Sequence, residues 1–235
     1  MIWKDCGDFL KKDDQTRLLL ERVADINTIA PAPEYIKLWK DVSYEVQVRK
    51  ANRHGLTQND LVECLVGLQK RPYYLAHIAR EFGVKNIVEI GTAQGLQCYS
   101  FAKYIRDENV DGHVWTCDIE DHRNKKYSEE YSEEATFCLG TSAELGQLLR
   151  EREKEVDLFY IDADHRSGAV LRDVENLRHL QTDNSLWIFD DFDLRFGCYS
   201  DIMQLSKKNG RFKFYRVGDA ASGNPNHQMI IFGKL

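Results

Sequence analysis

Ile87-Val88-Glu89-Ile90, followed at once by Gly91-Thr92-Ala93-Gln94-Gly95, is the stretch that decides the fold of this chain. The apolar run predicts a buried strand, and the two glycines predict a sharp turn into a helix. The spacing Gly-x-x-x-Gly differs from that of dinucleotide sites, and no Lys-Ser or Lys-Thr pair follows, so pyrophosphate is not the expected ligand. The Glu89 carboxylate would repel phosphate but accept hydrogen bonds from an ammonium group. The turn favours a nucleoside that carries an amino acid, although a strand-to-helix junction without a ligand also uses glycines.

The composition is typical of a globular protein that acts on a small molecule. The chain has 235 residues, of which 43% are hydrophobic and 30% charged, with a formal net charge of −6. This length permits one large domain or two small ones, and we expect one. The net acidity argues against the basic surface that binds nucleic acid.

Cysteine usage and hydropathy indicate where the protein works. The six cysteines are scattered without a Cys-x-x-Cys pair, so we expect reduced thiols. The N-terminus lacks the apolar core of a signal peptide, and no apolar run is long enough to span a bilayer. We therefore expect a cytoplasmic protein that does not bind membranes.

Helical periodicity characterises the N-terminal third of the chain. It predicts a first helix near the N-terminus, a second over residues 35–51 and a third that opens at Thr57. Pro72 is expected in the first turn of a fourth helix that ends near Gly83. We interpret residues 1–80 as a helical extension of the same domain, which covers the strand ends as a lid or forms a homodimer contact.

From residue 86 onward, short apolar runs alternate with amphipathic stretches, as in helices stacked on a parallel sheet. The last two runs are joined by a Gly, Asn and Pro-rich loop without room for a helix, so they should form an antiparallel hairpin. The expected strands cover residues 86–90, 113–118, 136–139, 156–161, 185–190, 212–217 and 228–232. We predict an α/β fold for residues 81–235, a doubly wound, mostly parallel seven-stranded sheet of the Rossmann-like type with a C-terminal antiparallel hairpin.

An acid at the end of the second predicted strand suits a ribose. Asp118 closes that strand, and the fold places it beside the turn that follows Ile90. A carboxylate there accepts hydrogen bonds from both ribose hydroxyl groups. Glu120 and Asp121 are close enough in sequence to be rivals for this role, and a solvated acid at a strand end is the alternative interpretation.

A second group of acids follows two later strands. Asp162, Asp190 and Asp191 should meet at one point, where they would repel one another unless a positive charge lay among them. A divalent cation is the simplest such charge, and oxygen ligands favour Mg²⁺, Mn²⁺ or Ca²⁺ over zinc. Helix capping is the alternative role for these acids. His165 lies at the same place and has the pKa of a general base for a hydroxyl group.

These residues together resemble the class I S-adenosylmethionine-dependent methyltransferases, and among them the metal-dependent O-methyltransferases that include the catechol and macrolide-sugar enzymes. The resemblance covers about residues 84–235 and is carried by the motifs VEIGTAQG at 88–95, CD at 117–118, IDADH at 161–165 and FDD at 189–191. It implies S-adenosylmethionine as the cofactor, a divalent cation such as Mg²⁺, and a hydroxyl group of a small molecule (a sugar, natural product or phenol) as the acceptor.

The resemblance also implies a role for individual residues. The implied cofactor contacts are Glu89, Gly91, Thr92, Gly95, Asp118, Ser142, Ala143 and Asp162, with Ser142 and Ala143 at the adenine. The implied metal ligands are Asp162, Asp190 and Asp191, and the implied catalytic base is His165. The catechol enzymes carry Lys at the base position, whereas relatives that act on sugars carry His, so a catechol substrate is disfavoured. Asp191 stands where the catechol enzymes have Asn, and Gln97 where they have Ser.

Two other functions stay open. One is a metal-independent methyltransferase that acts on nucleic acid or protein, for which the basic stretch at 49–53 leaves room. The other is a cofactor-binding protein of the same fold without catalysis. Net acidity opposes binding to nucleic acid, and the intact acid cluster opposes the loss of chemistry.

Overall fold

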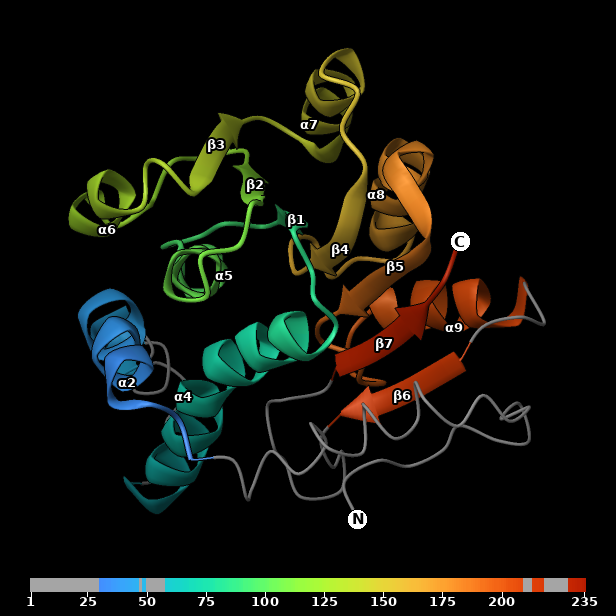
Figure 1. Ribbon diagram of the computed structural model, residues 1–235. Coiled ribbons are helices and arrows are strands. Elements are labelled where there is room, and N and C mark those ends of the chain that lie inside the picture. The colour runs from blue at the N-terminus through green and yellow to red at the C-terminus, as the bar shows by residue number, and fades with distance from the viewer. Residues whose placement is uncertain (1–29, 47, 50–57, 209–212, 218–227) are drawn as a thin grey trace.

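The computed structural model describes residues 30–46, 48–49, 58–208, 213–217 and 228–235. A central sheet carries helices on both faces (Figure 1). The strands are β1 (Asn86–Ile90), β2 (His113–Asp118), β3 (Ala135–Leu139), β4 (Val156–Ile161), β5 (Gln181–Phe189), β6 (Lys213–Val217) and β7 (Gln228–Phe232). The helices are α2 (Pro33–Trp39), η1 (Lys40–Tyr44), α4 (Gln58–Glu81), α5 (Leu96–Asp107), α6 (Lys125–Glu130), α7 (Ser142–Glu151), α8 (Ala169–Leu177), η2 (Arg178–Leu180) and α9 (Cys198–Lys208).

The strand order is β3-β2-β1-β4-β5-β7-β6 in one seven-stranded sheet. The first five strands pair in parallel, while β7 runs antiparallel to both β5 and β6. The α/β class and the C-terminal antiparallel hairpin are thereby confirmed. The order reverses between β1 and β4, and a doubly wound sheet binds its ligands at such a switch point.

Apolar runs predicted the strands closely where both faces of a strand are covered. The bounds of β1, β2, β4 and β7 agree with the prediction residue for residue. β5 differs, because it begins at Gln181 instead of Ser185 and ends before Asp190. Its first residues are polar and partly exposed, yet Gln181 still pairs with Val156 of β4 through the backbone. Backbone pairing without apolar burial leaves no hydrophobic pattern to find.

The register of the sheet brings the predicted site residues to one edge. Ile90 pairs with Cys117 and with Ile161, and Ile161 pairs with Phe189. The residues that follow these positions therefore lie side by side at the carboxyl edge of the sheet, and they are Gly91, Asp118, Asp162 and Asp190.

Two hydrophobic cores lie on opposite faces of the sheet. α2, α4 and α5 cover one face, and α7, α8 and α9 cover the other (Figure 1). Phe159 and Trp187 stack in the second core with ring centroids 3.9 Å apart. The two cores hold the sheet rigid beneath the loops at its carboxyl edge.

A single helix replaces the two that were predicted around Pro72. α4 is continuous over Gln58–Glu81 with Pro72 inside it, so the predicted boundary is wrong. An internal proline removes a backbone hydrogen bond and costs about 3 kcal/mol. The turns that follow bury Tyr74, Leu75 and Ile78 completely, and this burial offsets the cost of the proline.

The N-terminal helices pack against the domain. The Tyr127 hydroxyl donates to Asp41 Oδ2 at 2.6 Å, and Leu38 is buried in the core beside α4 and α5. The predicted helix near the N-terminus and the predicted cap at Thr57 lie outside the described residues. In the part of the chain described by the structure, no helix has the length and apolar character needed to cross a membrane. The described cysteines Cys98, Cys117, Cys138 and Cys198 are free thiols, as expected.

Candidate functional site

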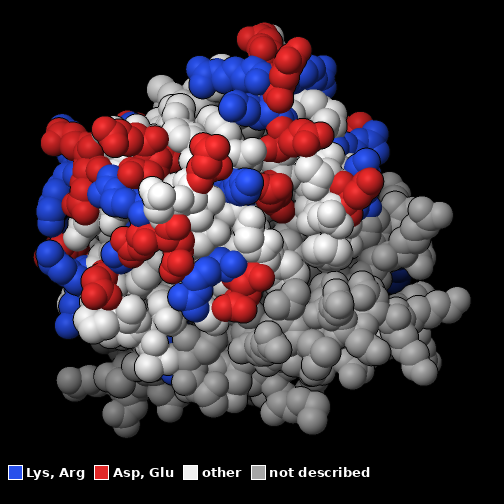
Figure 2. Space-filling model, in the orientation of Figure 1, with Lys and Arg blue, Asp and Glu red and all other residues white. Residues whose placement is uncertain are grey.

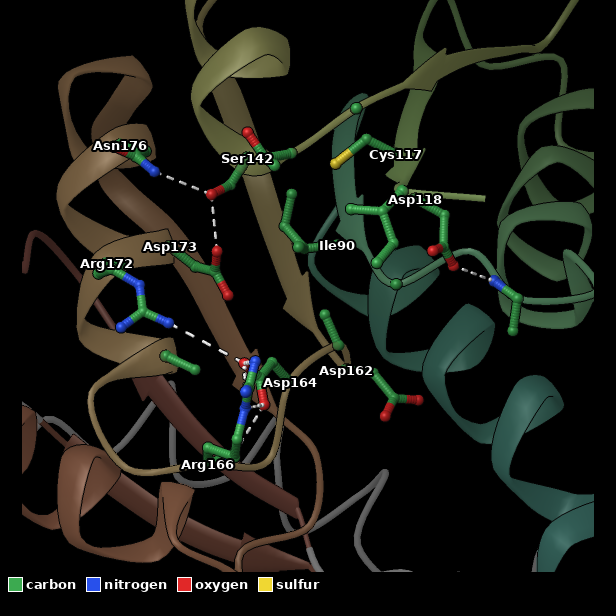
Figure 3. Close-up of a pocket in the computed structure, with 17 residues that line it drawn as sticks. Ile90, Cys117, Asp118, Ser142, Asp162, Asp164, Arg166, Arg172, Asp173 and Asn176 are labelled. Carbon is green, nitrogen blue, oxygen red and sulfur yellow. Dashed lines mark hydrogen bonds and ion pairs between the residues drawn. The ribbon is translucent and has the colours of Figure 1, made fainter. Parts of the chain in front are cut away.

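Two cavities open at the carboxyl edge of the sheet. The large cavity, of about 660 Å³, lies over the ends of β1 and β2 and the starts of α7 and α8 (Figure 3). The small cavity, of about 320 Å³, lies on the α4 and α5 side of the same loops. Four residues line both cavities, and they are Gly91, Ala93, Asp162 and Ala163. The two cavities therefore meet at the loops that follow β1 and β4.

Gly91 is required by the neighbouring loop. Its φ is +96°, and a Cβ at this position would lie 2.1 Å from the backbone oxygen of Asp162. Gly95 has a φ of +87° at the start of α5, where a Cβ would lie 2.4 Å from the Tyr99 ring. Gly95 is not among the residues that line either cavity. Gly91 thus allows the loops after β1 and β4 to touch at the place where both cavities meet, and Gly95 shapes the start of α5.

Gly91→Ala should lower the free energy of unfolding by at least about 2 kcal/mol, since the new methyl group forces the Asp162 loop to move and strains the backbone. Gly83→Ala is the matched control, because Gly83 also has a positive φ, +61°, but has no atom within 4 Å of a Cβ. That control should lose only about 1 kcal/mol. Urea unfolding of both variants measures the difference, and equal losses would contradict the close approach of the two loops.

Asp118 lies at the large cavity, as predicted. Its Oδ2 accepts a hydrogen bond from the Ala93 backbone N–H at 2.8 Å, so it fixes the loop after β1 while lining the cavity (Figure 3). Its rivals are engaged elsewhere, Glu120 with His122 at 2.7 Å and Asp121 with Arg123 at 2.9 Å. Neither rival is among the residues that line the large cavity.

Ser142 belongs to a hydrogen-bonded group at the other end of the large cavity. Its hydroxyl donates to Asp173 Oδ1 at 2.6 Å and accepts from Asn176 Nδ2 at 2.9 Å (Figure 3). Asp173 and Asn176 lie on α8 and were not predicted, because nothing in their own stretch of sequence distinguishes them from other polar residues of an amphipathic helix. Ala143 lines a different hollow, together with His179 among others, and not the large cavity.

The buried side chains of Glu89 and Gln97 provide polar groups in the small cavity that can form further hydrogen bonds. Glu89 is 1% exposed, accepts a hydrogen bond from Thr116 Oγ1 at 2.6 Å, and lines the cavity with Thr92, whose hydroxyl lies 2.5 Å from that of Thr116. Burial raises the pKa of Glu89 to about 8, although the hydrogen bond from Thr116 opposes the rise. The buried amide of Gln97 has no partner for either polar atom within the described residues. Groups of this kind fit the ammonium and carboxylate of a bound amino acid.

Asp162, His165 and Asp191 form a candidate metal site. One ligand atom from each lies within 4.8 Å of the others. His165 stands between the two acids, with Nδ1 3.0 Å from Asp191 Oδ2 and Nε2 3.7 Å from Asp162 Oδ1. The neighbouring carboxylates of Asp162 and Asp191 raise the pKa of His165, against the effect of burial. Two carboxylates and an imidazole suit a divalent cation, so the donor set fits the predicted group.

Asp190 is occupied by other partners. Its Oδ2 forms an ion pair with Arg71 of α4 and accepts from the Tyr160 hydroxyl at 3.1 Å, and its Oδ1 accepts from Gln228 Nε2 at 3.3 Å. Arg71 also lies 3.6 Å from Asp162 Oδ2. Arg71 thus supplies a positive charge of the kind that the sequence interpretation assigned to a metal. No local signal marks it, since 119 residues separate it from Asp190.

The two acids nearest Arg71 differ in their tendency to ionise. Burial raises the pKa of Asp190, and the charges of Asp162 and Asp191 raise it further, while Arg71 opposes this. Burial acts in the same direction on Asp162, but the neighbouring His165 and the charge of Arg71 outweigh that effect and lower the pKa of Asp162. Asp162, which borders both cavities, is therefore the acid that holds its charge more readily.

Residues 88–192 match the family model of a methyltransferase domain. These residues form a methyltransferase domain. This assignment agrees with the switch-point cavities and confirms the predicted resemblance to the S-adenosylmethionine-dependent methyltransferases. A comparison with curated protein sequences finds no significant match.

Solved structures share the fold of this methyltransferase at low sequence identity. A proposed O-methyltransferase from Klebsiella pneumoniae superposes with a TM-score of 0.60 at 16% identity, over 94% of this chain and 97% of that chain. The O-methyltransferase from Bacillus cereus in complex with S-adenosylhomocysteine (SAH) gives 0.57 at 14% identity, over 92% and 100%. An rRNA methylase from Streptococcus thermophilus gives 0.52 at 13% identity, over 68% and 95%. The fold is therefore common to methyltransferases with different kinds of acceptor.

Proposed function

We propose that this methyltransferase transfers the methyl group of S-adenosylmethionine to a hydroxyl oxygen of a small molecule. The observation that carries the proposal is that the two cavities share Gly91, Ala93, Asp162 and Ala163. A nucleoside in the large cavity and an acceptor in the small cavity would meet at these residues. The Bacillus cereus O-methyltransferase, which binds SAH on the same fold, supports the choice of cofactor.

The donor side uses the residues of both cavities. Asp118 would bind the ribose hydroxyls and Ser142 the adenine, while Glu89 and Gln97 would bind the amino-acid end where it enters the small cavity. S-adenosylmethionine supplies a methyl group on a sulfonium, which needs no covalent nucleophile from the protein. Catalysis by the chain then consists of positioning the two reactants and controlling charge.

The acceptor side uses the acids and the histidine. His165 would take the hydroxyl proton at Nε2, because Asp191 holds Nδ1 at 3.0 Å and both acids stabilise the imidazolium that forms. Asp162 and Asp191 would hold a divalent cation, which when bound makes a nearby hydroxyl group more acidic. In this proposed mechanism, the role of Asp190 is to position Arg71 and Tyr160.

His165→Gln should separate the role of base from the role of metal ligand. If His165 is the base, methyl transfer should fall by about 10²-fold to 10⁴-fold, while Mn²⁺ binding measured by calorimetry stays within a few-fold. A loss of Mn²⁺ binding of more than about 10-fold would make His165 a ligand and remove it as the base.

In the wild type, kcat/KM should increase with pH as His165 loses its proton. Because the pKa of His165 is above its ordinary value of 6.5, the midpoint of this increase should lie above pH 6.5.

The function itself is tested by methyl transfer from tritiated S-adenosylmethionine. The acceptors should be a panel of sugars, phenols and other small hydroxyl compounds, compared with total RNA and with protein. Label on a small hydroxyl compound supports the proposal, and label on RNA alone would overturn it. The sharing of the fold with an rRNA methylase makes the RNA arm necessary.

The second candidate function is that of a metal-independent methyltransferase, and the position of Arg71 favours it. Its guanidinium already lies among the acids, so a cation is not needed to relieve their repulsion. Transfer that is unchanged after dialysis against EDTA would support this candidate. Nucleic acid remains the less favoured acceptor. On the face of the molecule drawn in Figure 2, acidic and basic side chains are interspersed over the described residues and do not form a basic patch there.

The N-terminal helices are proposed to act as a lid over the acceptor. Ser43 of the π-helix η1 lines the small cavity, so this segment borders the place proposed for the substrate. We retain residues 1–80 as an extension of the domain formed by residues 81–235, and the homodimer contact stays a prediction. The acceptor would be selected by these helices, since they border the cavity opposite the cofactor.

A further inference from the structure

The loop at residues 162–168, which carries His165, lies against the start of α9. The His165 carbonyl oxygen accepts a hydrogen bond from Cys198 N–H at 2.9 Å. The imidazole packs edge-to-face on the Phe196 ring, with the ring centroids 5.2 Å apart. A Cβ at Gly197 would lie 2.6 Å from a backbone nitrogen of the loop, so the two backbones touch. The start of α9 therefore supports both the backbone and the ring of His165.

Asp201, in the first turn of α9, anchors the end of the same loop. Its Oδ1 accepts a hydrogen bond from Gly168 N–H at 2.9 Å. Gly168 is the N-cap of α8 and has a φ of +83°, so this bond fixes a residue whose backbone is otherwise free to change. Asp201 is only 3% exposed, and its Oδ2 has no hydrogen-bond partner within the described residues. A buried carboxylate with an unmet oxygen lowers stability, which points to a role other than folding.

The first turn of α9 also contacts the loop after β5. The Cys198 thiol donates to the Asp191 carbonyl oxygen at 3.6 Å. Asp191 has a φ of +50°, a conformation that is uncommon for residues other than glycine. α9 thus holds the backbones of both His165 and Asp191, whose side chains lie 3.0 Å apart. Movement of either loop relative to α9 would change the distance between these two side chains.

We propose, on the basis of the proposed role of His165 as the base, that Asp201 is a positioning residue that holds the imidazole toward the acceptor hydroxyl. Asp201 is not among the residues that line either cavity, so it acts through the loop. Ile202 and Leu205 fix α9 in the second hydrophobic core, which makes the anchor rigid. Without the bond to Gly168 the loop can shift, and a displacement of about 1 Å costs about 100-fold in rate.

The test measures the single-turnover rate of methyl transfer from tritiated S-adenosylmethionine to whichever small hydroxyl compound the wild type labels fastest. Asp201→Ala should lower this rate by about 10-fold to 100-fold. Calorimetric binding of SAH should stay within about threefold of the wild type, because Asp201 does not border the cavities. Asp201→Asn should restore the rate to within about threefold of the wild type, since its carboxamide oxygen can still accept from Gly168 N–H.

Asp157→Ala is the matched control. Asp157 Oδ2 accepts from the backbone N–H groups of Lys85 and Asn86, both at 2.9 Å, at the opposite edge of the sheet. Both alanine variants should lower the melting temperature by about 2 to 6 °C, because each removes an acceptor of backbone hydrogen bonds. Only Asp201→Ala should slow methyl transfer and speed hydrogen exchange in the peptide that covers residues 162–168.

The possible results separate this proposal from the proposed function. A wild type that labels no acceptor would overturn the proposed function and the role of Asp201 together. If the wild type labels an acceptor, the role of Asp201 alone is overturned when Asp201→Ala slows transfer no more than Asp157→Ala, or when Asp201→Asn fails to restore the rate. If Asp201→Ala does not fold, Asp201→Ser provides the test. Its side chain is one atom too short to reach Gly168 N–H, so transfer should slow by about tenfold.

Discussion

Glu89→Gln is expected to raise the free energy of unfolding at pH 8.5 and, in the same protein, to abolish tight binding of SAH. The folded pKa of Glu89 is about 8, against an ordinary value of 4.5, because the carboxyl is buried. The folded state thus binds the proton more tightly than the unfolded state. The stability that this proton provides is complete below pH 4.5 and is lost as the pH rises through about 8.

The gain in stability should therefore depend on pH. Gln cannot ionise, and its carbonyl oxygen can still accept the hydrogen bond from Thr116. The variant should equal the wild type within about 1 kcal/mol at pH 5 and exceed it by about 3 to 5 kcal/mol at pH 8.5. Urea unfolding at the two pH values measures this, with Glu175→Gln as the surface control. A difference that is the same at both pH values would show that Glu89 does not hold a proton in the folded state.

The effect on binding has the opposite sign. The proposed partner of Glu89 is the ammonium group of the cofactor, and replacing the carboxylate with an amide should weaken SAH binding by about 100-fold. Binding should also expel the proton from wild-type Glu89 at pH 7, where the free protein largely retains it. Calorimetry in buffers of different ionisation enthalpy counts that proton. Retention of both tight binding and proton release in Glu89→Gln would place the ammonium elsewhere.

The parts of the fold and site that follow from local sequence were predictable. The strand that ends at Ile90 and the acids that follow β2, β4 and β5 occupy the expected edge, because apolar runs and strand order place them there. Arg71, Asp173 and Asn176 were not found, since each acts on a partner far away in sequence from a helix of ordinary composition. Electrostatic reasoning correctly required a cation near the acids but could not distinguish a metal from a guanidinium.

At about pH 9, above the raised pKa of Asp190, Arg71→Met should cost about 3 to 5 kcal/mol of unfolding free energy, because it leaves the Asp190 carboxylate buried without its counter-ion. Asp190 is only 4% exposed, so water cannot replace the guanidinium. The double variant Arg71→Met with Asp190→Asn should recover about 2 to 3 kcal/mol of that loss, since it removes the unpaired charge. Arg106→Met is the matched control. Arg106 pairs with Glu134 at 2.7 Å but is more exposed, so its removal should cost about 1 kcal/mol or less.

Arg71→Met should also change the affinity for a divalent cation. The guanidinium lies 3.6 Å from Asp162, where its charge opposes a cation held by Asp162 and Asp191. Without it, Mn²⁺ should bind about tenfold more tightly and should raise the melting temperature of Arg71→Met by more than that of the wild type. Equal Mn²⁺ effects in the two proteins would mean that the cation binds away from this cluster. A larger effect in the variant would mean that Arg71 and a metal ion compensate the same carboxylates, so that the charge provided by α4 limits how strongly this methyltransferase holds a metal.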